Sequence, residues 1–110
     1  MEVGAPRRGE VYLVSLDPAR GPEIRKTRPC VIVSPDDLND HLGTFLIARM
    51  TTGGHPYPFR ISCRFQDREG FVVADQLRTV DRGRLVRRLG TLSPAAMGET
   101  LDVLQRMFAA

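Results

Sequence analysis

The sequence contains no tryptophan, two histidines, two cysteines and a single lysine, Lys26. No apolar run approaches the roughly 20 residues that a membrane-spanning helix requires, so we expect no membrane association. The first twelve residues hold two arginines with no apolar segment behind them, which does not match a secretory signal peptide. These absences predict a cytoplasmic protein.

The few cysteines and histidines do not form a metal-binding pattern. Cys30 and Cys63 are far apart in the sequence, and neither has metal-ligand spacing with His41 or His55. Cys30 lies in an apolar run, where a free thiol behaves as a small hydrophobic side chain. We therefore expect no disulfide, no structural metal and no cofactor, and we interpret both histidines as surface residues.

The charge balance is mildly basic. Sixteen basic and 13 acidic residues give a net charge of +3 and an isoelectric point near 9.4, which permits nucleic acid as a partner. Almost all of the basic residues are arginine, whose guanidinium binds two phosphate oxygens at once in a way that lysine cannot. A genome-wide preference for arginine is the alternative explanation, and the composition leaves both open.

The pattern of apolar residues predicts mostly strands in a single domain over residues 1–110. Ser34 is expected to cap a short helical turn, with Asp37 at the capping-box position. Phe59, Phe65 and Phe71 fit core packing better than base stacking. Predicted strands cover residues 11–16, 29–33, 44–51, 57–63, 71–74 continuing through 75–80 past a bulge, and 89–92. Predicted helical turns cover 35–39 and 82–86.

A C-terminal helix is expected after Ser93, which suits the N-cap, and Pro94, which suits the first helical position. Its apolar residues recur at helical spacing, so one face is predicted to cover the open end of a sheet, and a partner groove is the alternative. The expected fold is a small, mostly antiparallel β barrel (α+β) closed by this helix. The apolar stripe comprises Met97, Leu101, Val103, Leu104, Met107 and Phe108.

The stretch over residues 21–35, GPEIRKTRPCVIVSP, concentrates the candidate chemistry. It begins as a polar, basic loop with Glu23 and becomes an apolar strand. Arg28 stands where the two meet, and the following proline restricts it to extended backbone geometry. A guanidinium at the start of a rigid strand, with Arg25 and Lys26 nearby, predicts a binding site for an anion such as phosphate.

Five motifs in the same order and spacing resemble the MazF/PemK toxins: RGEVYLVSLDP, GPExxxxRPCVIVSP, ARMTT, YPF and EGFVVADQLRTVD. The resemblance implies a compact SH3-like β barrel that acts as a homodimer. It also implies a sequence-specific, ribosome-independent endoribonuclease that cleaves single-stranded RNA, including mRNA, without a metal. The implied products carry a 2′,3′-cyclic phosphate and a 5′-hydroxyl, and the implied inhibitor is a cognate MazE-like antitoxin.

The same resemblance assigns the catalytic arginine to Arg28, the catalytic threonine to Thr51 and the loop glutamate to Glu23. Each has a simpler alternative: Arg28 could pair with a carboxylate, Thr51 could only end a strand, and Glu23 could be a solvated charge. The chain departs from the family around Glu23, where Pro22 and Ile24 replace polar residues. This departure puts the RNA sequence preference in doubt.

For RNA binding, we expect phosphate contacts from Arg25, Lys26 and Arg49, and we place Thr52 in the same surface. Gln76 and Arg78 are expected to reach base edges or to stack on unpaired bases, although an alternating polar face is also typical of a solvated sheet.

Two other functions remain open from the sequence. One is a non-enzymatic toxin of the same fold that poisons DNA gyrase through its C-terminal end. The end of the chain, residues 105–110, is expected to offer no bulky exposed anchor after the helix for that contact. The other is an RNA-binding barrel without catalysis.

Overall fold

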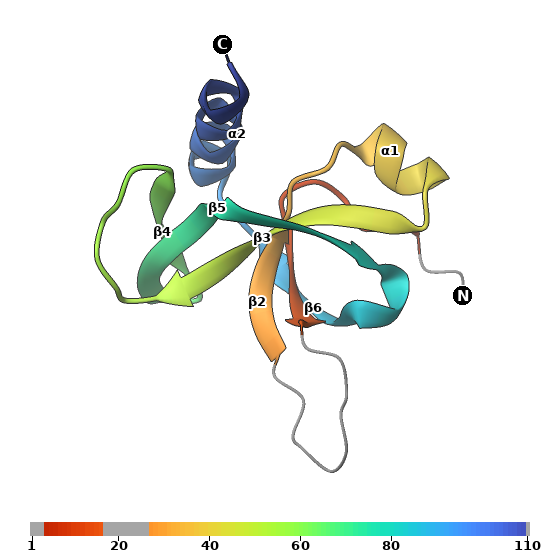
Figure 1. The fold of residues 1–110 in the computed structure, drawn as a ribbon. Helices are drawn as coiled ribbons and strands as arrows, with labels where there is room; N and C mark the ends of the chain where they lie inside the picture. Colours follow the sequence, from red (N-terminus) through yellow and green to blue (C-terminus); the bar gives the residue numbers. More distant parts are fainter. Residues whose placement is uncertain (1–3, 17–26, 110) are drawn as a thin grey trace.

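The computed structural model describes residues 4–16 and 27–109, and residues 1–3, 17–26 and 110 lie outside this description. The described part has six strands, two α-helices and one short 3₁₀ turn (Figure 1). Its elements are β1 (Glu10–Ser15), β2 (Thr27–Ile32), α1 (Asp36–His41), β3 (Thr44–Thr52), β4 (Arg60–Phe65), β5 (Arg68–Asp81), the 3₁₀ turn (Arg82–Arg84), β6 (Leu85–Thr91) and α2 (Pro94–Phe108).

The strands form one antiparallel sheet in the order β4-β5-β3-β2-β1-β6. The prediction of an antiparallel β fold with a C-terminal helix is confirmed, but the sheet is not closed, because β4 and β6 are its edges. A side chain brings these edges together: Gln66 Nε2, in the turn between β4 and β5, donates a hydrogen bond of 3.0 Å to the Leu89 carbonyl in β6. The term barrel therefore applies only loosely.

Two apolar clusters pack on the two faces of the sheet, because neighbouring residues along a strand point to opposite faces. Val31 belongs to the cluster that α2 covers, whereas Cys30 and Ile32 belong to the cluster on the other face. Phe45, Ile32 and Ile47 are the largest buried side chains of that second cluster. The strand that carries Arg28 is thus held by packing on both of its faces.

Helix α2 begins as predicted. The Ser93 hydroxyl accepts a hydrogen bond of 3.2 Å from the Ala96 backbone, and Met97 and Val103 are buried against the sheet. Phe108, the last member of the predicted stripe, is instead 74% exposed. The prediction that the apolar stripe covers the sheet is therefore wrong at Phe108, the last residue of the helix.

The prediction that Ser34 caps the first helix is wrong. Pro35 occupies the N-cap position without a side-chain cap, and Ser34 is buried and hydrogen-bonded to Asn39 instead. The Ser34 hydroxyl lies 2.5 Å from Asn39 Oδ1 and accepts a bond of 3.0 Å from the Leu46 backbone. The Asn39 amide in turn donates to the Pro6 carbonyl at 3.0 Å. A buried amide needs such partners, which explains why the hydroxyl faces inward.

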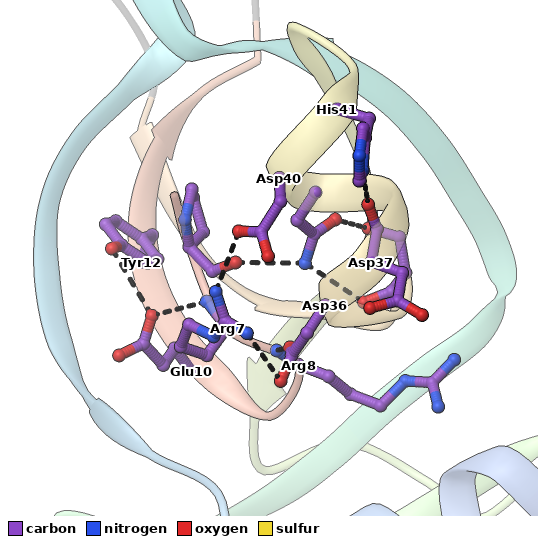
Figure 2. Close-up of polar contacts among 11 residues, drawn as sticks. Arg7, Arg8, Glu10, Tyr12, Asp36, Asp37, Asp40 and His41 are labelled. Carbon is purple, nitrogen blue, oxygen red and sulfur yellow. Dashed lines mark hydrogen bonds and ion pairs between the residues drawn. The ribbon is translucent and has the colours of Figure 1, made fainter. Parts of the chain in front are cut away.

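Charged side chains fix the segment before β1 to α1 (Figure 2). Arg7 donates to Asp40 at 2.8 Å and pairs with Asp36 at 3.1 Å. The Arg8 backbone N–H donates to Asp36 Oδ1 at 2.7 Å, and its side chain donates to the Val33 carbonyl at 2.8 Å. These contacts lower the pKa of the Asp36 carboxyl, with the Arg8 backbone bond as the main cause.

The second half of the sheet departs from the predicted boundaries. β4 begins at Arg60 rather than residue 57, because Phe59 adopts a φ of 67° and is 46% exposed. Gln66 and Asp67 have φ values of 52° and 62°, typical of a two-residue hairpin turn, so β5 begins at Arg68 rather than at residue 71. The predicted bulge is confirmed: Ala48 faces Leu77, whereas the next residue of β3 faces Val73.

The sequence pattern predicts a helical turn over 82–86 and a strand over 89–92, and the structure differs at both boundaries. The 3₁₀ turn ends at Arg84, and β6 already begins at Leu85. Phe65, the last residue of β4, packs against the core as expected.

Candidate active site

Strands β2 and β3 are paired over only three positions and then separate. Cys30 faces Arg49, and the ladder ends there; if the register continued, Arg28 would face Thr51. Instead, β2 stays with β1 through the pair of Arg28 with Val14, and β3 stays with β5 through the pair of Thr51 with Phe71. Figure 1 shows the two strands diverging. The two predicted catalytic residues therefore lie at the ends of strands that part.

A pocket of about 350 Å³, here called the wedge pocket, lies between the parted strands. Pro29 lines it from β2, next to Arg28, and Thr51 and Thr52 line it from β3. The β4–β5 hairpin and β6 form its other wall. The full lining comprises Pro29, Met50, Thr51, Thr52, Cys63, Phe65, Gln66, Arg68, Gly70 and Leu89.

Gly70 holds Thr51 in place by allowing a close approach of two backbones. A Cβ atom on Gly70 would lie 1.7 Å from the Thr51 carbonyl oxygen, a distance that no side chain tolerates. The Thr51 hydroxyl lies 3.5 Å from the Gly53 carbonyl, the limit of a hydrogen bond. The hydroxyl is thus only weakly engaged at the mouth of the wedge pocket.

Arg28 is half-buried in β2, and its guanidinium donates one hydrogen bond of 2.9 Å to the Thr27 carbonyl. Within residues 4–16 and 27–109, no ion pair joins Arg28 to a carboxylate. A guanidinium has five N–H donors, so most of the Arg28 donors make no hydrogen bond to the described residues. The simpler role of a structural salt bridge is therefore not observed in this part of the chain.

A second pocket of about 350 Å³, here called the arginine pocket, gathers three of the predicted RNA-binding residues: Arg49, Gln76 and Arg78. The Arg49 Nε atom is buried and has no hydrogen-bond partner among the described residues. A buried, unpaired donor is unfavourable, so this position suits an anion supplied from outside. The full lining comprises Leu16, Cys30, Ile47, Arg49, Gln76, Leu77 and Arg78.

Cys30 lines the arginine pocket but is not a nucleophile. Burial raises the pKa of its thiol to about 12, although the charges of Arg49 and Arg78 act in the opposite direction. Because the thiolate is the reactive form, Cys30 is inert near neutral pH.

The remaining predicted residues fall into two groups. Glu23, Arg25 and Lys26 lie outside the described residues. His41 and His55 are exposed, and His41 Nδ1 lies 2.6 Å from the Asp37 carbonyl within α1.

Within residues 4–16 and 27–109, no three histidine, cysteine or acidic side chains lie close enough together to bind a metal ion. No helix in this part of the chain is long and apolar enough to cross a membrane.

Sequence reasoning missed the far wall of the wedge pocket, which comprises Cys63, Phe65, Gln66, Arg68 and Leu89. The predicted strands over 57–63 and 71–74 leave Gln66 in the connection between them. No local pattern indicated that Gln66 would contact Leu89, which is 23 residues further along the chain.

Comparisons with known proteins identify the family of this chain. The family described as PemK-like, MazF-like toxins of type II toxin–antitoxin systems matches residues 7–108. The chain is 34% identical over 90 residues to the endoribonuclease toxin MazF of Escherichia coli strain K12, and the match covers 81% of each chain.

Solved structures are similar over nearly the whole chain. One is a mycobacterial endoribonuclease in complex with its cognate antitoxin, with a TM-score of 0.78, 30% identity and 93% of each chain covered. Another is a chain of the MazE–MazF crystal structure from Deinococcus radiodurans, with a TM-score of 0.80 and 25% identity over 94% of this chain and 95% of that one. This chain therefore belongs to the PemK-like, MazF-like toxin family of type II toxin–antitoxin systems.

Proposed function

We propose that this chain, as one domain over residues 1–110, is an endoribonuclease toxin that cleaves single-stranded RNA. The observation that carries the proposal is the pair of Arg28 and Thr51 at the diverging ends of β2 and β3, where a continued register would place the two residues opposite each other. The scissile phosphate binds between these two side chains. The similarity to endoribonucleases supports the same activity.

The reaction begins with attack of the ribose 2′-hydroxyl on the neighbouring phosphorus. Negative charge builds on the phosphate oxygens, and the Arg28 guanidinium stabilises it with two parallel hydrogen bonds. The Thr51 hydroxyl holds a phosphate oxygen or the leaving 5′-oxygen. Glu23 takes the 2′-proton, since arginine, with a pKa above 12, is a poor base. As the bond from the 2′-oxygen to phosphorus forms, the bond from phosphorus to the 5′-oxygen breaks, and the departing 5′-oxygen takes a proton from water. The products are a 2′,3′-cyclic phosphate and a 5′-hydroxyl, and no step uses a metal.

The arginine pocket binds the RNA beside the reacting group. Arg49 and Arg78 supply positive charge for phosphates, with Arg25, Lys26 and Thr52 extending the surface, and the Gln76 amide reaches a base edge.

The partners of the toxin are a cognate antitoxin and a second copy of the chain. Support for the antitoxin comes from the similar mycobacterial structure, which contains one. Support for a homodimer comes from an apolar groove of about 520 Å³ along α2, which includes Leu46, Leu101, Leu104 and the exposed Phe108. We place the toxin in the cytoplasm, where its RNA substrate occurs.

The test incubates the purified protein with one long RNA in the presence of a chelator, maps the cleavage sites and analyses the end groups. Arg28→Ala is expected to lower the cleavage rate by about 10²–10³, or about 3–4 kcal/mol of barrier, with an unchanged fold. Arg106→Ala, at an exposed arginine of α2, is the matched control and should cleave normally. Full activity of Arg28→Ala would remove this residue from the mechanism, and RNA recovered intact from the parent protein would leave only binding.

A further inference from the structure

The wedge pocket has the size and lining of a site for one small planar group. Its volume of about 350 Å³ lies in the roughly 300–1,000 Å³ range of small-molecule sites. Phe65 and Leu89 give it apolar walls, and the Phe65 ring lies so close to β6 that a Cβ on Gly90 would be 3.2 Å from it. A ring held in this way offers a fixed surface for stacking.

Gln66 gives the pocket a hydrogen-bonding edge. Its Nε2 donates to the Leu89 carbonyl at 3.0 Å, which fixes the orientation of the amide. An amide has two N–H donors and one carbonyl acceptor, so one donor and the acceptor remain for a ligand. Neighbouring donor and acceptor groups are the pattern that a base edge presents, and single-stranded RNA is read through unstacked bases.

The position of the pocket determines which base it can reach. Thr51 lines the pocket from β3 and Pro29 lines it from β2, so the pocket adjoins the ends of the two strands that carry the proposed catalytic residues. Arg68, at the start of β5, adds a cation to the lining. An aromatic wall, a fixed amide and a nearby cation fit a nucleotide better than an apolar protein side chain, which needs no amide.

We propose that the wedge pocket binds the base of a nucleotide that adjoins the cleaved bond, and that Gln66 determines which base is accepted. This inference rests on the proposed endoribonuclease function and deepens it.

The first experiment compares Gln66→Asn with Asp67→Asn. Both residues form the hairpin turn with positive φ, which asparagine tolerates, but Asp67 does not line the pocket. The shorter asparagine side chain in place of Gln66 cannot both reach Leu89 and contact a base. We expect Gln66→Asn to change the preference at one base next to the cut by at least about tenfold, measured on oligonucleotides that vary each flanking position. Asp67→Asn should retain the parent preference.

The second experiment measures occupancy without catalysis. Cys63 lines the pocket, and the other cysteine, Cys30, is buried and inert, so alkylation by N-ethylmaleimide reports on Cys63. The probe is an oligonucleotide with a 2′-deoxyribose at the cleaved position, which binds but lacks the attacking hydroxyl. It should slow the alkylation of Cys63, and the same oligonucleotide with a disfavoured base beside the cut should protect less.

The outcomes separate the two proposals. If the parent protein cuts no RNA, the proposed function fails and the inference fails with it. If the parent cuts but Gln66→Asn keeps the parent preference, or Cys63 reacts equally fast with and without the oligonucleotide, only the base pocket is overturned. Protection by an antitoxin peptide and not by the oligonucleotide overturns it as well, in favour of a protein-binding pocket. If Gln66→Asn does not fold, the alkylation result alone decides.

Discussion

Gly70 is a position where one added carbon would displace the candidate catalytic threonine, because its Cβ would overlap the Thr51 carbonyl. Gly70→Ala is therefore expected to force β3 and β5 apart, to lower the free energy of unfolding by at least about 2 kcal/mol and to reduce RNA cleavage. Chemical denaturation and a cleavage assay on the folded fraction measure the two effects.

The matched control is Gly98→Ala in α2. A Cβ at Gly98 meets no atom within 4 Å, and alanine favours the helix, so this variant should gain about 0.5–1 kcal/mol and keep its activity. If Gly70→Ala were as stable as the parent protein, the close approach of the two strands would not be needed to position Thr51.

Replacing Arg49 is expected to stabilise the folded protein and to weaken its binding to RNA. Its buried Nε has no partner among the described residues, so Arg49→Met should raise the free energy of unfolding by about 1 kcal/mol. The same change removes a phosphate contact, so the slope of log affinity against log salt should become shallower by about 0.7 for single-stranded RNA. Fluorescence anisotropy with the 2′-deoxy oligonucleotide measures the slope.

Arg87→Met, at an exposed arginine of β6 outside both pockets, is the control for the loss of one positive charge. Equal slopes for Arg49→Met and Arg87→Met would show that Arg49 contacts no phosphate.

At the scale of elements, α1 and the segment before β1 should loosen in acid. The pKa of Asp36 is lower in the folded protein than its ordinary value of about 3.9, chiefly because of the Arg8 backbone N–H. The stabilisation that the ionised Asp36 carboxylate provides is thus complete when the pH is above the ordinary pKa. It is lost as the pH falls through the lower pKa of the folded protein. The stability advantage of the parent over Asp36→Asn should therefore shrink below about pH 4. Thermal unfolding from pH 7 to pH 2 measures it.

Asp102→Asn, which makes the same charge change on α2, corrects for the general effect of losing one negative charge. If the parent protein stayed more stable than Asp36→Asn by the same amount down to pH 2, the role given to the Arg8 contact would be contradicted.

The sequence predicted those elements whose local pattern and packing agree. The capping residue and apolar spacing of α2 are local signals, and so are the β-branched runs of β1 to β3. The prediction for Ser34 is wrong because a serine before a helix usually caps it, and only the fold reveals the buried Asn39 that binds it. Phe59 fitted an alternating strand, but its positive φ depends on the loop before it.

The candidate site was predictable for Arg28 and Thr51, because family motifs mark both strand ends. The arginine pocket also joins residues that were predicted to bind RNA, Arg49, Gln76 and Arg78. The wedge pocket was not predictable, since it depends on where an open sheet brings Gln66 to Leu89. No periodicity along the chain encodes such a contact between two sheet edges.

At the scale of the molecule, the exposed end of α2 is the place to test assembly. Phe108→Ser removes a 74% exposed aromatic side chain from the groove along α2 and should weaken the proposed homodimer by at least about tenfold. Val86→Ser is the control, because Val86 is a similarly exposed apolar residue on β6 outside that groove. Size-exclusion chromatography with light scattering gives the mass of each. A parent protein that is monomeric at all concentrations, or a Phe108→Ser variant that dimerises as well as the parent, would contradict this assembly.

The parting of β2 from β3 has a consequence for how such toxins diversify. Arg28 and Thr51, two of the residues assigned to bond cleavage, come from these two strands, whereas the opposite wall of the gap comes from a hairpin and an edge strand. If the wedge pocket binds a base as proposed, changes in that wall alter which messages are cut while the reaction itself stays the same.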